Sequence, residues 1–209
     1  MRKHDVAQGD VFWQAGLWLG ECSLFNVEKL IQACNYILKK NNFSLNYTKL
    51  IKLLYLADKE SLKGTLGTIT GDTYVSMNNG PVLSRLYDLI KGRYGKSDAQ
   101  NLWDSRFIRD GHDLIAATDR IPQGELSEFE MRVLDDVYDR FEGYDYGKMI
   151  EYVHDNCPEW KHPRGSSIPI APREMLESIG RTQDEIEWIL GENMAFEKED
   201  MSFLSLAEL

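Results

Sequence analysis

The residues with the greatest capacity for chemistry in this chain are His154, Cys157 and His162. Imidazole nitrogen and thiolate sulfur are ligands that zinc prefers, and the spacing of these residues would supply three of them. The same residues also suit structural positions: a histidine at a helix end, a half-buried cysteine and a histidine in a loop. Only four histidines occur in 209 residues, and none adjoins a serine or cysteine in a context typical of nucleophilic catalysis. We therefore expect no metal site and no catalytic site.

Gly95-Lys96-Ser97 has the form of the end of a phosphate-binding loop. Such a loop needs a second glycine five residues before Gly95, and a strand in front of it. Ile90 holds that position and the preceding pattern is helical, so the match fails. Carboxylate pairs such as Asp135-Asp136 lie on predicted helices and indicate solvated faces. The sequence thus assembles no reaction and no cofactor site, and we expect a protein that is not an enzyme.

Composition excludes further classes of function. The formal net charge is −10, which disfavours direct DNA binding because an acidic surface repels phosphates. No apolar run approaches the roughly 18–20 residues that a membrane span requires. The three cysteines, Cys22, Cys34 and Cys157, are widely spaced and odd in number, which fits free thiols in a reducing compartment. We expect a cytoplasmic protein that neither spans a membrane nor binds DNA.

The two ends of the chain differ from its middle. Trp13 and Trp18 lie in an apolar N-terminal segment that either packs back on the domain or docks a partner or a second copy, which leaves a homodimer open. From Asp184 to Leu209, eight acidic residues and one lysine give a net charge of −7. This tail either maintains solubility or meets a basic partner. We therefore expect an N-terminal extension over residues 1–25, one domain over 26–191 and an acidic tail over 192–209.

Helical periodicity predicts most of the secondary structure of the domain. The segment from Thr48 is apolar on most faces, which predicts a central helix. Ser127-x-x-Glu130 and Thr182-x-x-Glu185 are capping boxes that mark two helix starts. The predicted helices cover residues 27–40, 48–62, 81–90, 127–141, 146–155, 172–180 and 182–190.

Strands are fewer, and they place the domain in the mainly α class (α+β with a minor antiparallel sheet). Residues 72–76 predict a strand, followed by a turn at Asn79-Gly80 and a helix that begins at Pro81. Residues 107–109 and 114–116 predict a hairpin that joins 72–76 in one small sheet. Residues 158–172 predict an irregular surface loop. The expectation is a compact helical domain with a small hairpin and strand insertion.

Several short sequence motifs, in their order along the chain, resemble those of a known family, the Panacea domain of SocA-like antitoxins and phage-associated GepA-type proteins. The resemblance extends over about residues 26–190. It rests on Lys52–Asp58 (KLLYLAD), Ile69–Val75 (ITGDTYV), Asn79–Val82 (NGPV), Leu86–Leu89 (LYDL), Leu126–Glu130 (LSEFE) and His154–Lys161. The family usually has an aromatic or small residue where this chain has Asn79.

The resemblance implies a small helical antitoxin that neutralises a cognate toxin by direct protein–protein binding. It leaves two alternatives open: a proteolytic adaptor that delivers the toxin to a protease, and a prophage or mobile-element protein with another target. The implied partner is a toxin, which the acidic tail would suit if that toxin is basic. No cofactor is implied.

The same resemblance directs attention to the turn and the helix start of the GDTYV…NGPV…LYDL region. Arg85 and Asp88 are the strongest candidates, because helical spacing turns them away from the apolar stripe. Tyr74, Pro81 and Tyr87 have an alternative role as buried, fold-determining residues. The candidate partner-binding residues are Asp72, Tyr74, Asn79, Arg85, Tyr87 and Asp88.

Overall fold

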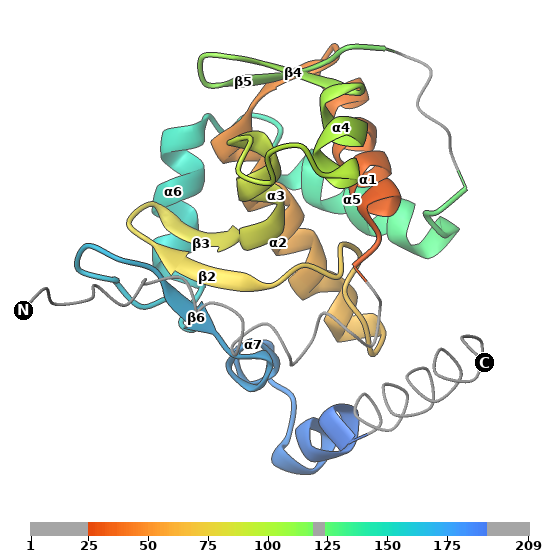
Figure 1. The fold of residues 1–209 in the computed structure, drawn as a ribbon. Coiled ribbons are helices and arrows are strands. Elements are labelled where there is room, and N and C mark those ends of the chain that lie inside the picture. The colour runs from red at the N-terminus through yellow and green to blue at the C-terminus, as the bar shows by residue number, and fades with distance from the viewer. Residues whose placement is uncertain (1–24, 119–123, 192–209) are drawn as a thin grey trace, which may run out of the picture.

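The computed structural model describes residues 25–118 and 124–191 (Figure 1). The segment with Trp13 and Trp18, the residue Cys22 and the tail after Gly191 lie outside the described residues. The elements are α1 (Val27–Lys40), β1 (Ser44–Asn46), α2 (Tyr47–Gly64), β2 (Tyr74–Met77), β3 (Gly80–Leu83), α3 (Ser84–Ile90), α4 (Asp98–Asp104), β4 (Phe107–Asp110), β5 (Asp113–Ala116), α5 (Glu128–Phe141), α6 (Tyr146–Asn156), β6 (Ile168–Ile170) and α7 (Pro172–Ser178). Residues 183–191 are also helical. The predicted class, mainly α with a minor antiparallel component, is confirmed.

Helix α2 forms the centre of the fold, as its sequence predicts. The side chain of Asn46 caps it by accepting hydrogen bonds from the backbone N–H groups of Thr48 and Lys49. Its side chains are buried on almost every face, and it packs against α1, α3, α5, α6, β1 and β3. Most elements of the fold therefore take their position from this one helix, which is seen among them in Figure 1.

The capping boxes are confirmed at both predicted helix starts. Ser127 Oγ accepts from the N–H of Glu130, whose carboxylate accepts in return from the N–H of Ser127. Thr182 and Glu185 exchange the same pair of hydrogen bonds at the start of the last described helix. These local signals need no tertiary contact, because both partners lie within one helical turn.

The helix predicted to begin at Pro81 is wrong: Pro81 lies in β3, and α3 begins at Ser84. β3 pairs with β2 in an antiparallel hairpin, with Ser76 opposite Pro81. Because β3 is the edge strand in the order β3-β2-β6, the missing N–H of proline interrupts no inner ladder.

The prediction that residues 72–76 and the 107–116 hairpin share one small sheet is also wrong, because the strands form two three-stranded sheets. One has the order β1-β5-β4 and the other the order β3-β2-β6. β1, which we did not predict, occupies the place beside the 107–116 hairpin that 72–76 was expected to take. Figure 1 shows β4 and β5 at the top of the molecule, and β2, β3 and β6 below them.

Two further elements escaped the sequence analysis. Residues 158–172 were expected to be irregular, but they include β6, whose Ile170 pairs with Tyr74 of β2. Pro169 lies in the middle of this edge strand, which hides it from pattern recognition. α4 was missed as well, and Ser97 of the Gly-Lys-Ser triplet is its N-cap, accepting from the N–H of Gln100.

Candidate functional site

The region that carries the candidate residues is held to α2 by one buried carboxylate, Asp58. Its Oδ1 accepts hydrogen bonds from the backbone N–H groups of Ile69 and Thr70, at 2.8 and 2.9 Å. Its Oδ2 accepts from the hydroxyls of Thr70 and Tyr74, the latter at 2.8 Å. Burial raises the pKa of Asp58 to about 6, against the opposing effect of these donors. Asp58 therefore ties the loop before β2, and β2 itself, to the central helix.

A second buried carboxylate, Asp72, fixes the start of α3. The N-cap residue of α3, Leu83, has no side chain that can accept a hydrogen bond. Asp72 takes over this role from outside the helix: it accepts from the N–H groups of Arg85 and Leu86, both at 2.9 Å. A carboxylate is favourable at this position because the helix N-terminus is partially positive. Burial nevertheless raises the pKa of Asp72 to about 7.

The turn between β2 and β3 is fixed by Gly80. Its φ of 98° lies in the region that favours glycine. A Cβ at this position would come within 2.6 Å of Val153 Cγ2 on α6 and 3.3 Å of Lys52 Nζ on α2. Close packing behind the turn therefore excludes any side chain there. Asn78 and Asn79 project from the same turn and are exposed.

The six predicted site residues fall into a buried pair and a surface set. Asp72 is fully buried and Tyr74 is 4% exposed. Asp72 accepts the hydrogen bonds that fix α3, and Tyr74 donates its hydroxyl to Asp58. The other four reach the surface around the turn and α3. We name these four, Asn79, Arg85, Tyr87 and Asp88, the turn–α3 surface.

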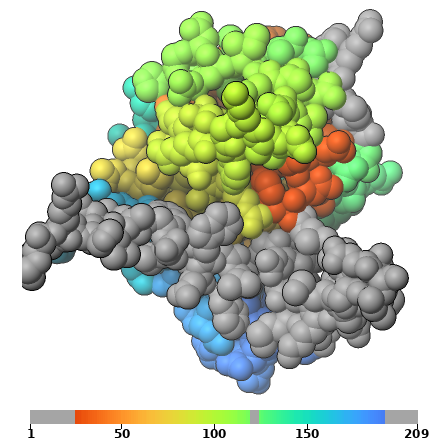
Figure 2. Space-filling view, viewed as in Figure 1, coloured from red at the N-terminus to blue at the C-terminus, as the bar shows by residue number. Residues whose placement is uncertain are grey.

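Each side chain of α3 in this set has a defined neighbour. The Arg85 guanidinium lies 4.6 Å from the centre of the Phe25 ring. Asp88 pairs with Arg93 at 2.9 Å, and the Arg93 guanidinium also lies over the ring of Tyr87. α3, coloured yellow-green, lies at the centre of the face shown in Figure 2. The structure thus displays aromatic and charged groups side by side on a fixed helix.

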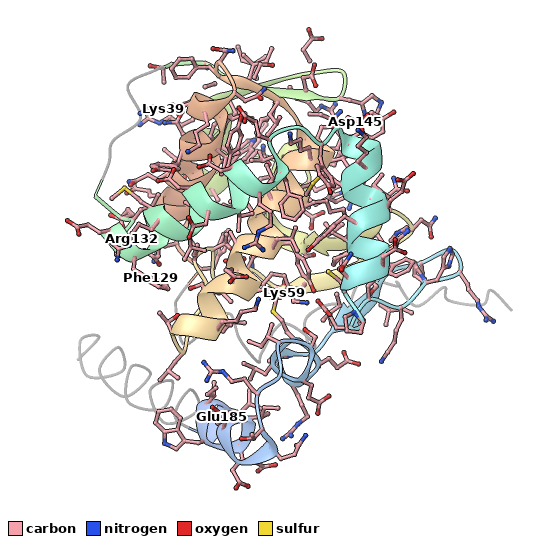
Figure 3. The ribbon with its side chains drawn as sticks, turned by 180° about the vertical axis from the view of Figure 1, so that it is seen from behind. Lys39, Lys59, Phe129, Arg132, Asp145 and Glu185 are labelled. Atoms are coloured by element: carbon pink, nitrogen blue, oxygen red, sulfur yellow. The ribbon has the colours of Figure 1, made fainter. Side chains whose placement is uncertain are left out.

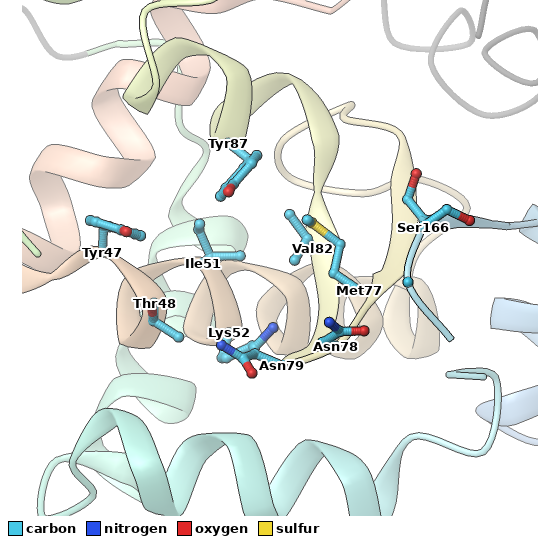
Figure 4. A pocket seen from close by; sticks show the side chains of 12 residues that line it. Tyr47, Thr48, Ile51, Lys52, Met77, Asn78, Asn79, Val82, Tyr87 and Ser166 are labelled. Carbon is cyan, nitrogen blue, oxygen red and sulfur yellow. The ribbon is translucent and has the colours of Figure 1, made fainter. Parts of the chain in front are cut away.

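A pocket of about 470 Å³ adjoins this surface (Figure 4). α2, the β2–β3 turn, α3 and the loop before β6 all contribute to its walls. Asn79 and Tyr87, two of the candidate residues, therefore line one cavity. The lining residues are Tyr47, Thr48, Ile51, Lys52, Met77, Asn78, Asn79, Val82, Tyr87, Gly165, Ser166 and Ser167.

Lys52 is the charged residue of this pocket, and sequence analysis did not select it as a site residue. It is 1% exposed, and its Nζ donates a hydrogen bond to the carbonyl oxygen of Pro81 at 2.6 Å. Burial lowers its pKa to about 7. A lysine in the middle of an apolar helix is a signal that could have identified it, because Lys is rarely buried without a reason.

Glu159 is a second missed residue, and it anchors the segment after α6. Its Oε1 accepts from the Tyr55 hydroxyl at 2.5 Å and from Lys59 Nζ at 2.6 Å. Figure 3 shows Lys59 on α2, seen from behind. The spacing of Lys52, Tyr55 and Lys59 places all three on one side of α2. This polar line along an otherwise apolar helix was visible in the sequence but not recognised.

The candidate zinc ligands have structural surroundings. The His154 ring stacks on Trp160, with centroids 4.0 Å apart and planes at 14°. The Trp160 indole donates to the carbonyl oxygen of Met77 at 2.9 Å, and Cys157 is buried, with its pKa raised to about 12 by burial. Within residues 25–118 and 124–191, no group of three or more His, Cys, Asp or Glu side chains is placed to hold a metal ion. The described helices likewise include none with the length and apolar character to cross a membrane.

Comparison with known proteins identifies the family. The model of the family described as antitoxin SocA-like, Panacea domain, matches residues 50–161, which is more than half of the chain. No curated protein and no solved structure matches. The matched range contains both buried carboxylates, the β2–β3 hairpin, α3, Lys52 and Glu159. The chain therefore belongs to the SocA-like antitoxin family and carries its Panacea domain.

Proposed function

We propose that this protein is an antitoxin that neutralises its cognate toxin by direct binding, and that the turn–α3 surface is part of the contact. The family match supports an antitoxin role. The observation that supports the location is the division of labour within residues 72–88. The side chains of Asp72 and Tyr74 are engaged in the buried hydrogen bonds that fix α3 and β2. The side chains of Arg85 and Asp88 take no part in these bonds.

The chemistry of this surface suits recognition of a protein. Tyrosine and arginine are the side chains most often found at the centres of interfaces, because each combines a large contact area with directional polar groups. Asp72 fixes α3 from below, so little conformational entropy is lost when a partner binds. We propose that the protein acts through binding rather than catalysis.

The experiment that tests this function is a growth-rescue assay combined with a pull-down. The protein encoded beside this gene is expressed from an inducible promoter, with and without this chain. We expect growth arrest that the wild-type chain relieves, and co-purification of the two proteins. Arg85→Glu should weaken binding by about tenfold or more and reduce rescue, because it reverses a charge at the contact.

The matched control is Arg109→Glu, which makes the same change at an exposed position on β4, in the other sheet. It should rescue as well as the wild type. Circular dichroism must show that both variants are folded. The proposed antitoxin function would be contradicted if the protein of the adjacent gene were harmless, or if it stayed lethal when the wild-type chain was abundant and soluble. The half-life of the toxin in cells separates neutralisation by occupation from delivery to a protease, which would shorten it.

A further inference from the structure

The pocket beside the turn–α3 surface has an unusual charge distribution for an acidic protein. Among its twelve lining residues, Lys52 is the one basic side chain, and none is acidic. The remaining polar groups are hydroxyls and amides, from Thr48, Asn78, Asn79 and Ser166 among others. These groups can all donate hydrogen bonds.

Lys52 has no counter-ion in the part of the chain that the structure describes. Its Nζ donates a hydrogen bond to a neutral carbonyl, and the nearby Cys157 thiol, whose pKa burial raises to about 12, carries no charge at neutral pH. Buried cations are normally paired with a carboxylate. Lys59, which lies on α2 like Lys52, is paired in this way with Glu159. Lys52 therefore differs from Lys59 in having no carboxylate partner among the described residues, and a carboxylate bound in the pocket would stabilise its charged form.

A second lysine, Lys91, contacts two of the residues that line the cavity. Lys91 Nζ donates to the Tyr47 hydroxyl at 2.7 Å and lies 4.3 Å from the centre of the Tyr47 ring. It also lies 5.4 Å from the centre of the Tyr87 ring. Lys91 makes no ion pair with any acidic residue of the described ranges. Lys91 thus contacts two tyrosines that line the pocket, Lys52 lines the pocket itself, and neither lysine pairs with a carboxylate of the described residues.

We propose that this pocket binds a carboxylate carried by the toxin, with Lys52 and Lys91 supplying the positive potential and the pocket amides and hydroxyls supplying hydrogen bonds. This inference rests on the proposed function, because Asn79 and Tyr87 belong both to the pocket and to the turn–α3 surface. A toxin segment laid on that surface would place a side chain or its chain terminus in the cavity. The carboxylate has two sources, an Asp or Glu side chain and a C-terminus.

The probes that test the pocket are small carboxylates and their neutral counterparts, added to the full-length protein. N-acetylglycine represents a chain terminus, and the amide of N-acetylaspartate represents an acidic side chain. Their controls are N-acetylglycinamide and the amide of N-acetylasparagine, which differ only in the charged group. Binding is followed through the side-chain amide signals of Asn78 and Asn79 in proton–nitrogen NMR spectra. We expect saturable shifts with one or both carboxylates, at roughly millimolar affinity for ligands of this size, and none with the amides.

Variants then assign the charge. Lys91→Met should weaken carboxylate binding several-fold and leave the rest of the spectrum unchanged, because Lys91 is partly exposed and contacts two tyrosines that line the pocket. Lys96→Met is the matched control, since Lys96 is exposed in the same part of the chain, and it should bind like the wild type. Lys52→Met should remove binding. If that variant does not fold, the Lys91 pair decides the outcome alone.

Equal shifts with the neutral amides, or no saturable shift with either carboxylate, would overturn the inference. Binding of inorganic phosphate without binding of the carboxylates would overturn the assignment of the ligand class. If the protein rescues growth but binds no carboxylate, the inference about the pocket is wrong and the proposed antitoxin function stands. If the protein binds carboxylates but does not rescue growth, the proposed antitoxin function is wrong and the pocket remains an anion-binding site.

Discussion

The two small sheets of this protein are built by different means. In the β3-β2-β6 sheet, every residue of β3 is buried, and carboxylates from distant positions fix its surroundings. In the β1-β5-β4 sheet, three of the four residues of β4 are exposed, and the hairpin between β4 and β5 closes within a few residues. Each sheet joins one local hairpin to one strand from a distant part of the chain, but buried carboxylates fix the surroundings of the first sheet, whereas the second leaves most of its edge strand β4 exposed. This difference predicts that substitutions in the first sheet and its buried contacts destabilise the protein more than equivalent substitutions in the second.

The largest expected effect comes from removing the carboxylate that joins β2 to α2. Asp58→Ala would leave the N–H groups of Ile69 and Thr70 and the Tyr74 hydroxyl without their acceptor in a buried place. We expect a loss of about 4 kcal/mol in the free energy of unfolding, because each unpaired buried group costs about 1–3 kcal/mol. Chemical denaturation measures this loss. Asp110→Ala in the exposed hairpin should change stability by less than about 0.5 kcal/mol, and a similar loss at both positions would contradict the comparison.

The two hairpin turns give a matched pair of glycine substitutions. Gly80→Ala should cost about 3 kcal/mol, because it combines a positive φ of 98° with a Cβ placed 2.6 Å from Val153 Cγ2. Gly111→Ala should cost about 1 kcal/mol, since its φ is 56° and nothing lies within 4 Å of the added Cβ. Thermal or chemical unfolding measures both.

The steric part of the Gly80 effect can be isolated. In a Val153→Ala background, Gly80→Ala should cost less than it does alone, because the clashing methyl group is gone. Equal costs of Gly80→Ala in both backgrounds would show that the backbone conformation alone carries the effect.

An effect smaller than that of Gly80→Ala is a pH dependence that arises from Lys52. Its pKa is about 7 in the folded protein, compared with a reference value of 10.5. Between these values the unfolded chain holds the extra proton, so the stability of the wild type rises with pH relative to Lys52→Met. From pH 7 to pH 9 we expect this difference to grow by about 2 kcal/mol, and below pH 7 to stay nearly constant. Denaturation of both proteins at several pH values measures it, and a difference that is flat across the range would show that Lys52 titrates normally.

Much of the local structure could be predicted because its causes lie close together in the sequence. The spacing of apolar residues marks α1, α2 and α5, and the capping boxes of Ser127 and Thr182 are complete within four residues. The β4–β5 hairpin was predicted for the same reason, since Asp110-Gly111 closes it locally. The choice of Asn79 and Tyr87 as candidates came from the family resemblance, and the structure places both at one pocket.

The sequence by itself determined the helical class, the central place of α2, the family and the region that carries the candidate surface. Only the tertiary structure decided that Pro81 lies in a strand, that the strands divide into two sheets, and that Asp72 caps α3 from a distance. It also decided that Lys59 is paired with Glu159, whereas Lys52 is buried with no counter-ion among residues 25–118 and 124–191. The physical reason is that a hydrogen bond or a buried charge depends on which groups meet in space. Periodicity and capping record only what neighbours along the chain prefer.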